Sequence, residues 1–419
     1  LLTLLLIINR TRKKLWLPFH APLLGFLFFM ALAMLAFVVG YLLYGTAGFK
    51  TFAVAMMGEI NVIWLVALLA LILLQLDRST VKRTLATAFA VFMLITSALV
   101  LYQKINFVSA YRFMDVFYVS NYRFKPLFMM WKADGFDRVM GPFFTPILLG
   151  TTLLLVVAVL LAYLLSEARS WLSYFATGII LLATAIGILS FSKTYMLGVP
   201  LLFLVTLVLI FLIKEKRRER LTRLLGLFLL VVAVYALVYV SLPEHMDNIK
   251  HYYYDFLLKP FGALSSRYEG IAEPMVNQIA EDAPKAVNGI AKNAFAIFKE
   301  HPLFGVGPVP IRGEFLGDSQ IIVTLHNGGI VASLAYLIFY IGNFVRSFIN
   351  KDLTRMLIII ALGMGCVASM MLTLPSTLPF IALLIYLGES DCPIRNLANR
   401  RGSKNTERKS DEIQLTPGV

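Results

Sequence analysis

Charged residues at the edges of apolar runs are the first candidates for chemistry in this chain. Lys193 lies in the very short connection Ser190–Thr194 between two apolar runs. A lysine so close to hydrocarbon is unfavourable without a partner, so it either extends to lipid headgroups or binds a phosphate. Arg267 begins the second part of a long polar interval, where it could bind phosphate or form an ion pair with Glu269 or Glu273.

Asp318 immediately precedes the apolar run that begins at Ser319. Its carboxylate could cap a helix, or it could act on an acceptor hydroxyl as a general base or bind a sugar. His326 follows about two helical turns later, and we expect it to be a buried hydrogen-bonding residue. Supporting roles are predicted for four residues near Asp318: His301, Arg312, Glu314 and His326.

The sequence gives no sign of a conventional hydrolase, nucleotide-binding, redox or metal site. The sequence contains no HExxH, GxSxG, Walker or CxxC motif, and its five histidines have no metal-ligand spacing. Its two cysteines, Cys366 and Cys392, cannot form a disulfide framework. We therefore expect neither a metal nor another cofactor.

Composition defines the class of protein. Of the 419 residues, 59% are hydrophobic and 15% charged, and the mean hydropathy is +0.78. We predict an all-α polytopic membrane protein with about 10–12 transmembrane helices. Ten spans are predicted at 22–44, 52–76, 85–102, 146–165, 171–190, 195–213, 221–240, 319–345, 356–374 and 378–387. Residues 1–8 are too few to span a bilayer and precede a basic cluster, so we interpret them as the end of another span rather than a signal peptide.

Alternate connections carry the basic residues. These connections begin at Arg10, Arg78, Lys214 and Arg346, and the tail after Asp391 is basic as well. The positive-inside rule assigns them to the cytoplasm, so the net charge of +14 is a topology signal and no nucleic-acid partner is expected. The predicted parts are a transmembrane bundle (1–241) with an outer loop (103–145), a large outer loop (242–318), further transmembrane helices (319–390) and a disordered tail (391–419).

The first outer loop is rich in aromatic residues with basic residues between them, Arg112 and Arg123 included. Such a segment could anchor itself in the membrane interface through its aromatic side chains. It could equally form a groove for an anionic lipid-linked substrate, in which guanidinium groups bind phosphate. Both interpretations require the same residues.

Four motifs in order carry a family resemblance. Ser190-Phe-Ser-Lys-Thr194 resembles the Ser-x-Ser-Arg element of bacterial O-antigen ligases and Wzy-type O-antigen polymerases. Ser266-Arg267 resembles the arginine of their large loop, and His301–Gly307 resembles the motif HPLxGxG that follows it. Asp318 through Val331 resembles the polar residue, apolar run and Gly-Ile-Val that come next.

The resemblance implies a metal-independent membrane glycosyltransferase of the GT-C type. It would lie in the bacterial inner membrane and transfer glycan from an undecaprenyl diphosphate carrier at the periplasmic face. By position, Lys193 and Arg267 would bind the diphosphate, and Asp318 would stand near the acceptor hydroxyl. Lys193 replaces the usual Arg, which keeps the charge but loses bidentate phosphate recognition.

Polymerase is the preferred activity. Ligases carry a His-Asn pair where this chain has Asp318-Ser319, and polymerases often have an acidic residue there. The resemblance leaves a ligase that transfers finished glycan to lipid A core as the nearest alternative, and a lipid or polysaccharide transporter as a more distant one. The expected partners are an undecaprenyl-diphosphate-linked oligosaccharide and membrane lipids, and a chain-length regulator could be a protein partner.

Overall fold

The computed structural model describes most of the membrane-embedded part of the chain. The described residues are 21–45, 48–76, 78–106, 109–110, 113, 139–143, 146–166, 170–213, 215–243, 246–247, 297–308, 319–368 and 376–390. They contain ten apolar helices: α2 (Ala21–Tyr44), α3 (Phe49–Gln75), α4 (Arg78–Ile105), α7 (Pro146–Ser166), α8 (Trp171–Leu189), α9 (Lys193–Ile213), α10 (Arg217–Ser241), α15 (Gln320–Ile349), α16 (Leu353–Ala368) and α17 (Leu378–Ser390).

The predicted fold class is confirmed. Eight of the helices in the described residues are long and apolar enough to cross a membrane, and α16 and α17 are shorter apolar helices. The chain is therefore an all-α polytopic membrane protein. Several helices begin earlier than predicted, and the difference is largest for α4, which begins at Arg78, and α10, which begins at Arg217. Basic side chains explain both differences, because they can continue a helix beyond the hydrocarbon and extend to the headgroups.

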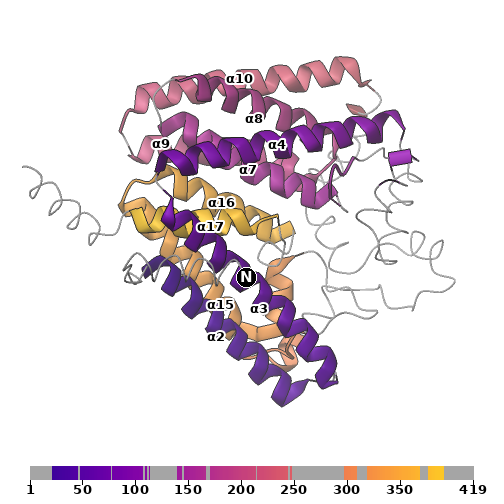
Figure 1. Ribbon diagram of the computed structural model, residues 1–419, viewed down its shortest axis with the longest axis vertical. Helices are drawn as coiled ribbons and strands as arrows, with labels where there is room; N and C mark the ends of the chain where they lie inside the picture. Colours follow the sequence, from indigo (N-terminus) through magenta and orange to yellow (C-terminus); the bar gives the residue numbers. More distant parts are fainter. Residues whose placement is uncertain are drawn as a thin grey trace, which may run out of the picture.

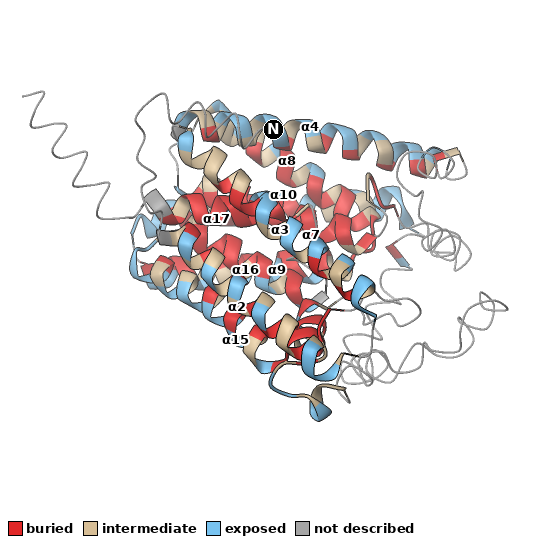
Figure 2. Ribbon diagram, turned by 60° about the horizontal axis from the view of Figure 1, so that its bottom comes forward, coloured by how far each residue is buried: buried red, intermediate tan, exposed pale blue. Residues whose placement is uncertain are grey.

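The helices pack around α7. Of its most apolar window, 89% is buried, against 17% in both α3 and α10. The helices α8, α9 and α16 pack directly on α7, and α10 covers α8 and α9 (Figure 1). On the other side, α15 packs on α2 and α16, while α17 packs on α3 (Figure 1). Figure 2 shows α7, α16 and α17 largely in the colour of buried residues.

One end of the bundle gathers the basic connections. Lys351, between α15 and α16, donates a 2.9 Å hydrogen bond from Nζ to Oε1 of Glu215, between α9 and α10. This bond lowers the pKa of the Glu215 carboxyl, because the ammonium favours the charged form. Arg223 of α10 donates to the carbonyl of Leu164 near the end of α7 at 2.7 Å. We call this end the basic face, and the opposite end, where α9 and α15 begin, the site face.

The helix α15 is broken at Gly329. This residue has φ 59° and ψ −152° within an otherwise helical segment, a conformation that is essentially restricted to glycine. The prediction of an uninterrupted span over 319–345 did not include this break. The backbone around it has lost two ordinary helical hydrogen bonds, from residue 330 to 326 and from 331 to 327.

The segment 302–307 fills the break with four backbone hydrogen bonds. Val306 and Gly307 donate their N–H groups to the carbonyls of His326 (3.0 Å) and Asn327 (2.9 Å). In the other direction, the N–H groups of Ile330 and Val331 donate to the carbonyls of Pro302 (2.8 Å) and Leu303 (3.1 Å). Every backbone group that the break would expose therefore has a partner, which hydrocarbon requires.

Two glycines allow this approach. A Cβ on Gly305, whose φ is +61°, would lie 2.3 Å from the carbonyl oxygen of His326. A Cβ on Gly329 would lie 2.5 Å from the carbonyl of Leu303. These distances are far below van der Waals contact, so a side chain at either position would separate the two segments.

We predict that Gly329→Ala destabilises the protein by at least about 2 kcal/mol, because it adds a steric clash to a backbone conformation that alanine disfavours. The matched control is Gly342→Ala in the same helix, where a Cβ would meet no atom within 4 Å. The control should leave stability unchanged or raise it, since alanine favours a helix. Thermal unfolding in detergent, followed by circular dichroism, measures both. Equal midpoints for the two variants would contradict the packed break.

Candidate functional site

The structure describes three of the predicted site residues, Lys193, His301 and His326. The other six lie outside the described residues: Arg112, Arg123, Arg267, Arg312, Glu314 and Asp318. Their roles remain predictions. The structure does describe the helices and turns next to the segments that contain them.

Lys193 is the first residue of α9 and follows a tight turn from α8. Ser190 caps α8 and donates from Oγ to the carbonyl of Gly187 at 2.8 Å. Phe191 then adopts φ +52°, a strained value for an aromatic residue. Its ring is buried against Ile188 and Met246, which holds the turn in place. This turn presents the half-buried Lys193 at the site face.

The electrostatics of this turn favour an anion. The N-terminus of a helix carries a partial positive charge, so an acidic residue would stabilise it and a lysine does not. The first turn of α9 contains no acidic residue. The lysine charge and the helix dipole therefore add, which would stabilise a phosphate group bound near them.

Close packing on α7 and α8 supports the turn. A Cβ on Gly150 of α7 would lie 2.0 Å from Oγ of Ser192, so only glycine allows α7 so close. The buried Ser192 hydroxyl has no hydrogen-bond partner. Tyr195 packs its ring on α8 and donates from its hydroxyl to Oγ1 of Thr184 at 3.3 Å. Lys193 thus stands on a rigid support.

The two ends of the first outer loop are fixed beside this turn. The side chain of Gln103, near the end of α4, accepts hydrogen bonds from the N–H groups of Met140 (2.9 Å) and Gly141 (3.1 Å). The N–H of Val139 donates to the carbonyl of Leu189, the last residue of α8, at 3.5 Å. The loop that contains Arg112 and Arg123 therefore leaves and rejoins the bundle next to the Ser190–Lys193 turn.

The two described histidines belong to the packing around the break in α15. The His301 ring stacks on Tyr44 at the end of α2, with centroids 4.0 Å apart. His326 is 6% exposed, and its Nδ1 lies 2.8 Å from Oδ1 of Asn327. His326 is thus the buried hydrogen-bonding residue that the sequence indicated.

The start of α15 lies beside the end of α16. Ser319 occupies the N-cap position of α15 and donates from Oγ to the carbonyl of Cys366 at 3.4 Å. Asp318, which precedes Ser319 in the sequence, lies outside the described residues. The same helix α16 also packs on α9, the helix that begins with Lys193.

An apolar groove opens on another side of α7. It lies between α4, α7 and α17 and has a volume of about 350 Å³. The lining runs from Pro142, Phe143 and Ser376 near the site face to Phe89 and Leu383 within the bundle. Thr152 of α7 lines this groove, only two residues after Gly150, which contacts Ser192. The groove and the Lys193 turn thus flank the same end of α7.

The sequence interpretation missed two features of this region. The clamp formed by Gln103 joins residues far apart in sequence and leaves no local pattern. The break in α15 did leave a signal, because Asn327-Gly328-Gly329 within an apolar run is a strong helix-breaking sequence. Glu59, an ionisable residue within α3, was also passed over.

The fold and this turn define a multi-pass membrane protein with a fixed cationic position at one face. Residues 178–328 match the family model described as O-antigen ligase, and this match supports the O-antigen ligase and polymerase superfamily. That family consists of glycosyl-transferring enzymes. The matched segment covers less than half of the chain, begins within α8 and ends next to the break in α15. No curated protein and no solved structure matched the chain.

We predict that the site face and the basic face lie on opposite sides of the membrane. In a background lacking Cys366 and Cys392, Lys193→Cys should react with a membrane-impermeant maleimide added to right-side-out bacterial membrane vesicles. The matched variant Lys351→Cys should react only after the vesicles are opened, because basic connections remain in the cytoplasm. Labelling of both variants, or of Lys351→Cys alone, in closed vesicles would refute this orientation.

Proposed function

We propose that the protein polymerises undecaprenyl-diphosphate-linked oligosaccharide repeat units at the periplasmic face of the inner membrane. The reaction is a metal-independent glycosyl transfer by a GT-C-type enzyme. The observation that carries this proposal is the extent of the family match, which contains the Lys193 turn, the large loop and the packed segment 302–307. Seven of the nine candidate residues lie in the matched segment, and the other two, Arg112 and Arg123, lie in the first outer loop before it.

Lys193 binds the diphosphate of the donor. The turn holds its ammonium at the start of α9, where the helix dipole adds to the positive charge. Arg267 contributes a second cation from the large loop, and Arg112 and Arg123 contribute from the first outer loop. As the glycosidic bond breaks, its electron pair goes to the diphosphate, and fixed cations stabilise this charge without a metal.

Asp318 acts at the acceptor. Its carboxylate takes the proton of an acceptor hydroxyl on another lipid-linked unit, and the hydroxyl oxygen forms the new bond to the sugar carbon. The location of Ser319 supports this role, because Ser319 bonds to the end of α16, and α16 also packs on α9. A donor bound at Lys193 and an acceptor near Asp318 would meet across the end of α16.

The carrier tail occupies the apolar groove between α4, α7 and α17. The groove begins at Pro142 and Phe143, next to the part of the chain that Gln103 clamps. A polyprenyl chain there would remain in hydrocarbon-like surroundings while its diphosphate lies at the site face. The 350 Å³ volume accommodates only part of such a chain, so the rest would lie in the bilayer.

An O-antigen ligase is the second candidate, and the description of the matched family favours it. The two activities share the donor site and differ in the acceptor. The acidic Asp318 in place of the ligase histidine supports the polymerase.

A transporter is a weaker candidate. A broken membrane helix often forms a transport site because its free backbone ends bind the substrate. In α15, the carbonyls of His326 and Asn327 and the N–H groups of Ile330 and Val331 already bond to residues 302–307. These four backbone groups are therefore already engaged within the protein.

We predict that Lys193→Ala lowers the rate of glycan transfer by about 100-fold or more, because one preorganised charge on the leaving group is removed. Lys193→Arg, which keeps the charge, should retain most of the activity. Lys50→Ala is the matched control, since Lys50 is an exposed cation at the start of α3 on the same face. The assay uses purified protein with a lipid-diphosphate-linked repeat unit. Wild-type activity in Lys193→Ala would exclude the phosphate role.

The product distribution separates the two enzyme activities. Wild-type protein should convert the lipid-linked repeat unit into a ladder of chain lengths on a gel. Asp318→Asn should abolish the ladder while leaving thermal stability intact, since the carboxylate is needed only as a base. Transfer in a single step to an added lipid A core acceptor, without a ladder, would establish the ligase instead.

A further inference from the structure

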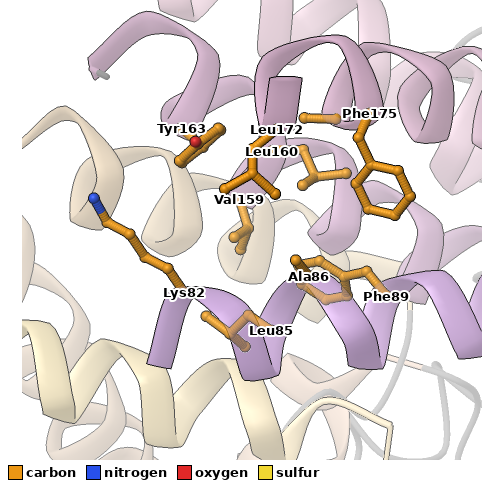
Figure 3. Close-up of a pocket in the computed structure, with 10 residues that line it drawn as sticks. Lys82, Leu85, Ala86, Phe89, Val159, Leu160, Tyr163, Leu172 and Phe175 are labelled. Atoms are coloured by element: carbon orange, nitrogen blue, oxygen red, sulfur yellow. The ribbon is translucent and has the colours of Figure 1, made fainter. Parts of the chain in front are cut away.

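A second apolar groove lies in the half of the bundle next to the basic face (Figure 3). It is formed by α4, α7 and α8 and has a volume of about 70 Å³, enough for roughly five water-sized groups. Six of its lining residues matter here: Lys82, Ala86 and Phe89 of α4, Leu160 and Tyr163 of α7, and Phe175 of α8. It adjoins the larger groove that serves the proposed reaction, with which it shares Leu85 and Phe89 of α4, and extends from them toward the basic face.

The groove is confined to one leaflet. Along α4 its lining extends from Lys82, in the second turn of the helix, to Phe89. Seven residues of helix rise about 10 Å, which is about a third of a hydrocarbon core about 30 Å thick. Along α7 and α8 the lining likewise starts near the ends at the basic face, with Tyr163 and Leu172. An occupant therefore enters from the basic face.

The mouth of the groove is polar and its depth is apolar. Figure 3 shows the Lys82 amine and the Tyr163 hydroxyl at one end, with hydrocarbon side chains along the rest. The Tyr163 hydroxyl lies 3.4 Å from Oγ of Ser170. Trp171, next to them at the start of α8, is 72% exposed, as is typical of aromatic side chains at a membrane interface. The mouth thus lies at headgroup level.

We propose that this groove binds an anionic phospholipid of the cytoplasmic leaflet. The first few methylene groups of one acyl chain fill the apolar part, and the phosphate lies at the Lys82 ammonium, within reach of the Tyr163 hydroxyl. A groove that faces lipid is always filled by some chain, because a void would forfeit dispersion contacts. The Lys82 ammonium selects the headgroup, because a cation at headgroup level attracts anionic lipid. This site does not depend on glycosyl transfer.

The test compares two phospholipids with identical palmitoyl and oleoyl chains. Native mass spectrometry of the full-length protein in detergent measures the binding of phosphatidylglycerol and of phosphatidylcholine. Wild-type protein should bind phosphatidylglycerol about fivefold more tightly, the preference expected of one lysine near an anionic headgroup. Lys82→Ala should remove the preference, and Lys82→Arg should restore it.

Two further variants test separately how the lysine charge and the apolar cavity contribute to lipid binding. Arg83→Ala removes the neighbouring exposed cation, which does not line the groove, and should keep the preference. Ala86→Phe fills the groove and should weaken the binding of both lipids. The proposal is overturned if Lys82→Ala keeps the wild-type preference, or if Ala86→Phe binds both lipids as wild type does. Displacement of phosphatidylglycerol by equimolar neutral polyprenol would also overturn it, because the groove would then take an isoprenoid chain.

Discussion

Four backbone hydrogen bonds between residues 302–307 and the break in α15 join the large outer loop to the membrane bundle. Hydrocarbon offers no water to unpaired backbone groups, so α15 can break at Gly329 only while this segment occupies the gap. The segment also contacts α2, where the His301 ring stacks on Tyr44. The end of the loop, α2 and both halves of α15 therefore form one unit, and the start of α15 is placed relative to that unit.

Local sequence patterns predicted the helices but not the way in which they interlock. Each span contains a long apolar stretch, so composition alone identified it. The break in α15 left the signal Asn327-Gly328-Gly329, but the segment that fills it begins 27 residues before Gly329 and left no local pattern. The support of Lys193 is equally non-local, since Gly150 and Gln103 lie on other helices. The position of Lys193 in a short connection was predictable, whereas its rigidity was not.

Cations at the two faces interact in opposite ways with the helix dipoles. At the basic face, Arg223 donates to the carbonyl of Leu164 near the C-terminal end of α7, where a positive charge complements the helix dipole. Lys193 lies at the N-terminal end of α9, where the dipole disfavours it. It also follows a residue with a strained backbone, Phe191. Departures from local preference concentrate at functional sites, so Lys193 is a stronger candidate for function than the more numerous arginines at the basic face.

The start of α15 and its break differ in what their side chains contact. At the break, His326 is buried, its carbonyl accepts a hydrogen bond from Val306, and its Nδ1 lies against Asn327. These contacts serve packing, and the His326 side chain is only 6% exposed. At the start of α15, the Ser319 hydroxyl donates to the end of α16, and α16 packs on the helix that begins with Lys193. The family match ends at residue 328 and so includes the first half of α15. These observations favour the start of α15 over its break for the proposed chemistry, and the break holds that start in place.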